Sequence, residues 1–127
     1  MRSNRPFVPF GTNYYDPNTG WPPQMWRQFN PEVISSQFEL MSELGVNCAR
    51  VFLTAATFQP DADTIDEQAL KKLDTLVRIA RRTGIRLILT GPDHWEGEPP
   101  YWEPDRFAGP EALRALDCFW TVVGRRY

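Results

Sequence analysis

The chain has 127 residues, a formal net charge of −2 at pH 7 and 42% hydrophobic residues, which is the composition of one globular domain. The weakly acidic balance argues against nucleic acid and against an anionic membrane surface as partners. No apolar run approaches the roughly 20 residues of a membrane span. The first residues lack the apolar core of a secretory signal, which leaves the compartment undetermined. Cys48 and Cys118 are too few and too far apart for a disulfide framework or a metal motif, so we expect both to be reduced.

Three repeats of strand, long loop and helix are predicted along the chain. Strands are expected at 7–13, 46–53 and 85–91. The second and third are short, apolar and rich in β-branched residues, which is typical of a parallel sheet covered on both faces. Pro9 is an objection to the first strand, because proline cannot donate a hydrogen bond to a ladder.

Each expected helix begins at a recognisable start signal. The first begins at 30–32, which reads Asn-Pro-Glu, the second near Asp66, and the third at 109–111, which reads Gly-Pro-Glu. Gly45 and Gly84 are suited to end the first two helices. The stripes expected to face the core are Ile34, Phe38, Met41 and Leu44 in the first helix, Leu70, Leu73, Val77 and Ala80 in the second, and Leu113, Leu116, Phe119 or Trp120, and Val123 in the third.

The repeat predicts the topology of the sheet. The helix-to-strand junctions at 43–47 and 82–86 look alike, and a strand–helix unit repeated at this period favours right-handed crossovers and parallel strands. The fold class is therefore α/β. The strand-to-helix loops are long, about 12 to 18 residues, and they follow the carboxyl ends of the strands, where α/β proteins build their sites.

Aromatic side chains gather in the loops after the first and third strands. They are Tyr14, Tyr15, Trp21, Trp26, Trp95, Tyr101 and Trp102. Prolines stiffen the same loops, and a rim of exposed aromatic rings is unfavourable unless a ligand stacks on it. Sugar rings have apolar CH faces, so we expect the group to bind carbohydrate. The alternative, for any single ring, is a place in a small loop core.

Arg50 lies inside an apolar strand and by alternation shares a face with Cys48 and Phe52, away from the helices. A buried guanidinium needs a carboxylate or a polar network, which indicates an anion in the pocket. The alternative is a salt bridge to a loop acid such as Asp93. His94 is the only histidine, so a histidine metal cluster is excluded. We expect it to hydrogen-bond a substrate hydroxyl or a carboxylate, unless it packs beneath the proline-rich loop.

Four segments in this order and spacing carry a family resemblance. They are Phe10-Gly11-Thr12-Asn13-Tyr14-Tyr15, Gly45-Val46-Asn47-Cys48-Ala49-Arg50-Val51, Leu89-Thr90-Gly91-Pro92-Asp93-His94-Trp95, and Phe119-Trp120 to Arg125-Arg126-Tyr127. Together they resemble the retaining (β/α)8 glycoside hydrolases of the cellulase and β-mannanase type, glycoside hydrolase family 5 and its relatives. The resemblance implies three consecutive βα units of a TIM barrel with parallel strands, an incomplete barrel. Residues 1–127 would be one N-terminal (βα)3 segment with no further domain in this chain.

The resemblance also implies site residues. Arg50 would hydrogen-bond the nucleophilic glutamate of the family, and His94 with its neighbours would line a sugar subsite. The substrate-binding residues expected in this way or from the aromatic loops are Asn13, Tyr14, Trp21, Arg50, Asp93, His94, Trp95 and Trp102. No catalytic residue, metal ligand or cofactor is implied, because the two catalytic glutamates of the family follow its fourth and seventh strands.

We therefore expect the N-terminal part of a glycoside hydrolase that cleaves β-linked polysaccharide or oligosaccharide and is inactive alone. Retaining hydrolysis needs two carboxyl groups about 5 Å apart. Two open sheet edges predict self-association or a missing C-terminal barrel segment. The alternatives are a non-catalytic carbohydrate-binding or interaction module, and a hydrolase that uses loop acids such as Asp93 and Glu96.

Overall fold

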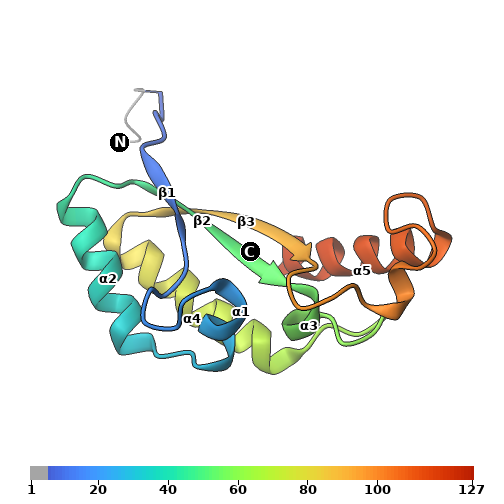
Figure 1. The fold of residues 1–127 in the computed structure, drawn as a ribbon. Coiled ribbons are helices and arrows are strands. Elements are labelled where there is room, and N and C mark those ends of the chain that lie inside the picture. Colours follow the sequence, from blue (N-terminus) through green and yellow to red (C-terminus); the bar gives the residue numbers. More distant parts are fainter. Residues whose placement is uncertain (1–5) are drawn as a thin grey trace.

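The computed structural model describes residues 6–127, and Figure 1 shows their arrangement. The elements are β1 (Gly11–Tyr14), α1 (Pro22–Arg27), α2 (Pro31–Glu43), β2 (Cys48–Thr54), α3 (Ala55–Phe58), α4 (Glu67–Thr83), β3 (Arg86–Asp93), the 3₁₀ helix η1 (Pro100–Trp102) and α5 (Pro110–Arg126). The three predicted repeats of strand and helix are confirmed. The short helices α1, α3 and η1 lie in the long loops and were not predicted. Within the described part of the chain, no helix is both long and apolar enough to cross a membrane.

The three strands form one sheet in the order β1-β2-β3, and both pairs are parallel. The predicted α/β class with parallel strands is confirmed. The sheet is open, so it corresponds to part of a TIM barrel and not to a closed one. The register places Asn13 beside Arg50 and Arg50 beside Ile88, so these three side chains share one face of the sheet.

The first strand is shorter than predicted. It begins at Gly11, four residues after the expected start, because Pro9 has no N–H for the ladder. The preceding segment is held by one side chain instead. The Asn47 side chain accepts from the backbone N–H of Phe10 at 2.8 Å and donates to the carbonyl of Val8 at 2.9 Å.

The third strand runs two residues further than predicted and ends at Asp93. A register shift after Phe52 brings Asp93 opposite Thr54. Gly91 lies at this irregularity with φ +150°, and a Cβ there would meet the carbonyl oxygen of Leu53 at 2.2 Å. The missing side chain therefore lets the two strands approach closely where the site begins.

Helices α2 and α4 begin as their start signals predict. The Asn30 side chain accepts from the backbone N–H groups of Glu32 and Val33, and the Asp66 side chain accepts from that of Ala69. The two helices lie against one face of the sheet (Figure 1). The main core lies between them and the strands, where the helix-side residues of β2, Ala49, Val51 and Leu53, are fully buried.

The predicted apolar stripe of α5 is wrong in its first half. Leu113 and Leu116 are exposed, whereas two smaller residues, Ala112 and Ala115, are buried. The alanines form a second core with the loop aromatics Tyr101 and Trp102 and with Ala55 and Ala62. Large rings in the loop leave room only for small residues on the helix, so side-chain size at this contact decides which face turns inward. Leu44, expected in the stripe of α2, is also exposed, because it lies at the end of that helix.

Candidate functional site

The sheet face opposite the helices carries an open hollow of about 410 Å³. Its lining residues come from all three strands and the segment before them: Pro9, Gly11, Thr12, Asn13, Cys48, Arg50 and Ile88. In a closed barrel this face points inward. The alternation prediction for β2 is confirmed, since Arg50 lies on this face and its neighbours Ala49 and Val51 are buried on the other.

Arg50 is exposed in the open sheet, so the expectation of a buried guanidinium is wrong for this structure. Its Nε donates to Oγ1 of Thr90 at 2.8 Å, and its guanidinium carbon lies 4.7 Å from the centre of the Phe52 ring. The alternative of a salt bridge to Asp93 is also wrong, because no carboxylate of residues 6–127 lies within ion-pair distance of Arg50. The guanidinium is therefore oriented by a neutral hydroxyl and an aromatic ring, with charge available for an anionic or hydroxylated partner.

An aromatic surface continues from Arg50 toward the carboxyl ends of the strands. The rings of Phe52 and Trp95 lie 4.9 Å apart at an angle of 31°. Trp95 remains 39% exposed, so part of its indole surface is free. A ring with one face open next to polar groups is suited to stack on the apolar face of a sugar.

Asp93 lies at the carboxyl end of β3, as predicted from its place after the third strand. Its Oδ1 accepts from the backbone N–H of Trp95 at 3.2 Å, while its Oδ2 is buried without a hydrogen-bond partner. Burial raises the pKa of this carboxyl above its ordinary value, the Trp95 N–H opposes the rise, and the nearby Glu96 carboxylate adds to it. His94, next along the chain, is exposed. The alternative of a histidine packed beneath the loop therefore does not hold.

Glu96, named above only as a loop acid of the alternative hydrolase, lies in the same loop as Trp95. Its side chain is 9% exposed, and its Oε1 forms an ion pair with Arg27 at the end of α1. Its Oε2 is buried without a partner, as is Oγ1 of Thr54. Asp93, Thr54 and Glu96 thus each hold a buried oxygen without a hydrogen-bond partner among the described residues, and groups of this kind are satisfied by a ligand or by water. The sequence predicted neither the burial of Glu96 nor its ion pair with Arg27.

Two of the expected sugar-contacting aromatics lie elsewhere. The ring of Tyr14 is buried on the helix side, where it meets Phe38 edge to face at 4.7 Å and its hydroxyl donates to Gln37 at 2.6 Å. Trp102 is buried in the second core with Tyr101. These are corrections to the expected site: Tyr14 belongs to the main core and Trp102 to the second core, and both rings are buried.

The remaining expected residues differ in position. Asn13 lines the hollow beside Arg50. Trp21 is partly exposed at the residue before α1, and no contact in the described structure joins it to the hollow. Trp26, also counted in the aromatic rim, is fully buried and donates from its indole nitrogen to the carbonyl of Phe52 at 2.7 Å. The structure thus gathers Asn13 and Arg50 at the hollow and Asp93 and Trp95 at the strand ends.

Of three comparisons with known proteins, only the comparison with solved structures found matches. No family model matches the sequence, and no curated protein matches it. Among solved structures, the exo-beta-1,4-mannosidase Op5Man5 from Opitutaceae bacterium strain TAV5 matches 94% of this chain with a TM-score of 0.80 and 24% identity. A GH5_18 glycoside hydrolase from Streptomyces cattleya in complex with Manβ1-4GlcNAc matches 91% with a TM-score of 0.75 and 22% identity.

A GH5_18 protein from Bifidobacterium longum subsp. infantis also matches 94% of the chain, with a TM-score of 0.72 and 24% identity. The chain spans between about a fifth and a third of the length of these proteins, 22%, 30% and 29% respectively. The resemblance noted in the sequence is thereby confirmed in three dimensions. This chain has the fold of one segment of a (β/α)8 barrel of the kind found in glycoside hydrolases of family 5.

Proposed function

We propose that this chain supplies part of the sugar-binding surface of a glycoside hydrolase that cleaves β-linked oligosaccharide or polysaccharide. The observation that carries the proposal is the group of Arg50, Phe52 and Trp95 on the sheet face opposite the helices. It combines an oriented cation with an aromatic surface at the carboxyl ends of parallel strands, where barrel enzymes bind their substrates. In the cellulase and β-mannanase type of enzyme, the resemblance assigns the arginine to this same surface.

We further propose a β-mannoside as the sugar. The support is that the solved structures with this fold include a protein described as an exo-beta-1,4-mannosidase and a complex with Manβ1-4GlcNAc. Asp93 and Glu96 add carboxylate acceptors suited to sugar hydroxyls. Asn13, which lines the hollow with Arg50, and the exposed His94 after β3 add polar groups.

The chemistry that we propose for the whole enzyme is double displacement by two carboxyl groups about 5 Å apart. The resemblance assigns those groups to a fourth and a seventh strand, which the three strands of this sheet do not include. The role of the described residues is then to bind and orient the sugar. Turnover by the 127-residue chain alone is not expected.

Calorimetric titration of the 127-residue chain with Manβ1-4GlcNAc and with cellobiose tests the proposal. Binding of the mannoside is expected, and Arg50→Met and Trp95→Ala are each expected to weaken it by about tenfold, the effect of losing a charge-assisted hydrogen bond or a stacked ring. Arg78→Met, on the outer surface of α4, is the matched control and should leave binding unchanged. Equal affinities for the Arg50 and Arg78 variants would contradict the proposed site, and tighter binding of cellobiose would contradict the proposed sugar.

An activity assay with a chromogenic β-mannoside separates the alternatives. No turnover by this chain is expected. Turnover that Asp93→Ala abolishes would instead support a hydrolase based on its own loop acids. If a chain extended by further strands binds the sugar but does not cleave it, the non-catalytic binding module is the better description.

A further inference from the structure

Helix α1 is joined to both halves of the aromatic pair in the proposed sugar site. The pair consists of Phe52 on β2 and Trp95 in the loop after β3, whose rings lie 4.9 Å apart. Trp26 of α1 contacts the backbone of Phe52. The next residue, Arg27, forms an ion pair with Glu96, the neighbour of Trp95. One short helix from the segment after β1 therefore links the two strands' contributions to this surface.

Trp26 fixes the position of α1 relative to β2. Its ring is fully buried and meets Phe58 edge to face at 4.9 Å, and its carbonyl accepts from Lys72 of α4 at 2.6 Å. The indole nitrogen donates to the carbonyl of Phe52 at 2.7 Å. Because β1 ends opposite Val51, this carbonyl lies just beyond the end of that ladder, and Trp26 supplies its donor. The end of α1 is thus a firmly held support.

Arg27 connects this support to the turn that carries Trp95. The side chain of Glu96 is 9% exposed; its Oε1 pairs with Arg27, and its Oε2 has no partner within residues 6–127. A buried carboxylate that loses its partner is strongly unfavourable, so without Arg27 the side chain of Glu96 would turn toward solvent. The N–H of Gly97 donates to the carbonyl of His94 at 2.9 Å, which places Trp95 and Glu96 in one tight turn. Movement of Glu96 would therefore shift the Trp95 ring.

The charge of Arg27 also acts against a repulsion within this turn. Burial raises the pKa of the Asp93 carboxyl, and the Glu96 carboxylate adds to the rise, so the two acids lie close enough to repel each other. Asp93 Oδ1 in turn accepts from the backbone N–H of Trp95 at 3.2 Å. Arg27 therefore compensates one of the two acids that flank Trp95.

We propose that Arg27 is a positioning residue of the sugar site, which sets the orientation of the Trp95 ring relative to Phe52 without contacting the sugar. The proposal rests on the proposed function, since it takes this ring pair as part of the sugar-binding surface. The described residues that line the hollow beside Arg50 include none from α1, which supports an indirect role. A ring pair fixed before the sugar arrives lowers the entropy that binding costs.

Nuclear Overhauser contacts between the rings of Phe52 and Trp95 test the positioning without any sugar. The isotope-labelled 127-residue chain is expected to show these contacts, and Arg27→Met is expected to lose most of their intensity. Arg27→Lys should restore it, because the ion pair uses a single nitrogen–oxygen contact that an ammonium group can also make. Unchanged contacts in Arg27→Met would overturn the proposal.

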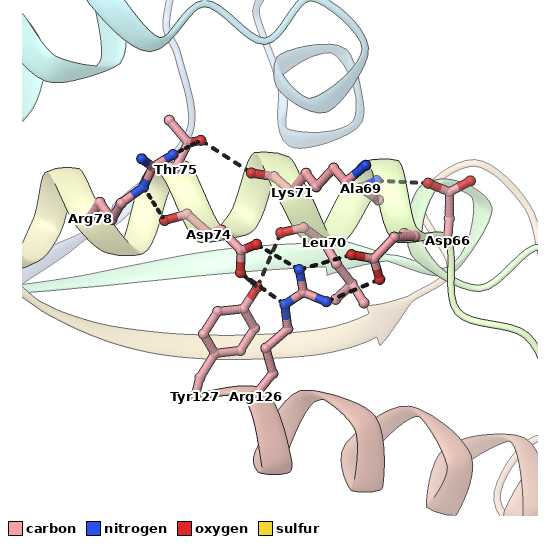
Figure 2. Close-up of polar contacts among 10 residues, drawn as sticks. Asp66, Ala69, Leu70, Lys71, Asp74, Thr75, Arg78, Arg126 and Tyr127 are labelled. Atoms are coloured by element: carbon pink, nitrogen blue, oxygen red, sulfur yellow. Dashed lines mark hydrogen bonds and ion pairs between the residues drawn. The ribbon is translucent and has the colours of Figure 1, made fainter.

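Arg126→Met is the matched control. Arg126 joins α5 to α4 on the helix side of the sheet, where it donates to Asp74 at 2.6 Å and to both carboxylate oxygens of Glu67 at 3.0 Å, as Figure 2 shows. This variant also loses ion pairs between two elements, but it should leave the ring contacts of Phe52 and Trp95 unchanged. Equal loss of the contacts in both variants would indicate general loosening of the fold and would overturn a specific role of Arg27.

Calorimetric titration with Manβ1-4GlcNAc tests the consequence for binding. Arg27→Met is expected to weaken binding by about fivefold in the parent chain, and to cause no further loss in the Trp95→Ala background, where the ring to be positioned is missing. A further loss of the same size in that background would show that Arg27 contacts the sugar itself, and would overturn the proposal.

The two experiments separate this proposal from the proposed function. If the parent chain does not bind the sugar while Arg27→Met loses the ring contacts, the proposed function fails and the positioning of the rings by Arg27 stands. If the parent binds the sugar and Arg27→Met keeps both the ring contacts and the affinity, the role of Arg27 alone is refuted.

Discussion

Arg50 and Thr90 are joined side chain to side chain between β2 and β3, Nε to Oγ1 at 2.8 Å, on the face opposite the helices. This hydrogen bond fixes the direction of the guanidinium while leaving its terminal nitrogens without a carboxylate. Thr90 is thus a positioning residue for the proposed sugar site. It is half-buried itself.

Thr90→Val is expected to weaken the binding of Manβ1-4GlcNAc by about fivefold, because the guanidinium loses a hydrogen bond that orients it. Thr75→Val is a matched control, since Oγ1 of Thr75 accepts from Arg78 at the same 2.8 Å on the outside of α4. Calorimetric titration of both variants measures the difference. In a double variant with Arg50→Met, the loss from Thr90→Val should disappear. Additive losses would show that Thr90 acts independently of Arg50.

Trp26→Phe is expected to lower the free energy of unfolding by about 2 kcal/mol, because the smaller ring leaves a cavity and the Phe52 carbonyl loses its donor. Trp26 is fully buried, and its indole nitrogen lies 2.7 Å from that carbonyl. Urea denaturation measures the change. Trp120→Phe, at a partly exposed ring, should change the stability by no more than about 0.5 kcal/mol. Equal effects at the two positions would contradict this account of Trp26.

Asp93→Asn is expected to stabilise the protein at neutral pH, and the gain should vanish in acid. Burial raises the pKa of the folded Asp93 carboxyl above its ordinary value of 3.8, so the folded state binds the proton more tightly than the unfolded state. The stability from this proton is fully present below pH 3.8 and is lost as the pH rises through the folded pKa. Asparagine stays neutral at every pH, so the variant does not lose stability as the pH rises. Thermal unfolding between pH 3 and 8 measures the difference in stability between the variant and the parent protein, and this difference should increase with pH.

Asp74→Asn serves as the opposite case. The hydrogen bond from Arg126 lowers the pKa of the Asp74 carboxyl, so its contribution to stability is present above the unfolded pKa and is lost as the pH falls through the folded pKa. The variant should therefore be less stable than the parent at neutral pH and approach it in acid. If both variants were more stable than the parent at neutral pH, or both less stable, the opposite pKa shifts of Asp93 and Asp74 would be contradicted.

Gly91→Ala is expected to destabilise the fold by more than about 2 kcal/mol, because its Cβ would lie 2.2 Å from the Leu53 carbonyl oxygen in a conformation that favours glycine. Gly124→Ala should act in the opposite direction. Gly124 lies inside α5 with open space around it, and alanine at such a position is about 1 kcal/mol better than glycine. Urea denaturation measures the stability of both variants. A loss of stability in both would show that replacing any glycine destabilises the fold, and would contradict a constraint specific to Gly91.

Local signals in the sequence predicted the three long helices α2, α4 and α5 and the parallel sheet. The caps at Asn30 and Asp66 and the left-handed glycines Gly45 and Gly84 act over three or four residues, so they can be recognised without tertiary structure. Alternation along β2 also placed Arg50 on the correct face, because its period depends only on strand geometry.

The burial of side chains in the long loops could not be predicted from local signals. Burial of Tyr14 and Trp102 depends on rings and alanines that are distant in the sequence. Hydrophobicity alone ranked Leu113 above Ala112, although the contact with the loop rings favours the smaller residue. The burial of Glu96 could not be predicted, because it depends on an ion pair with Arg27, which lies 69 residues earlier in the chain.

The ion pair of Arg27 with Glu96 has a consequence for protein engineering. It ties the segment after β1 to the segment after β3, so neither can be exchanged by itself. A graft of the second segment from a relative would remove Glu96 and leave Arg27 without its partner. A graft of the first would remove Arg27 and leave the largely buried carboxylate of Glu96 unpaired. Altering what this scaffold recognises therefore requires the two segments to be transplanted together, as a single cassette.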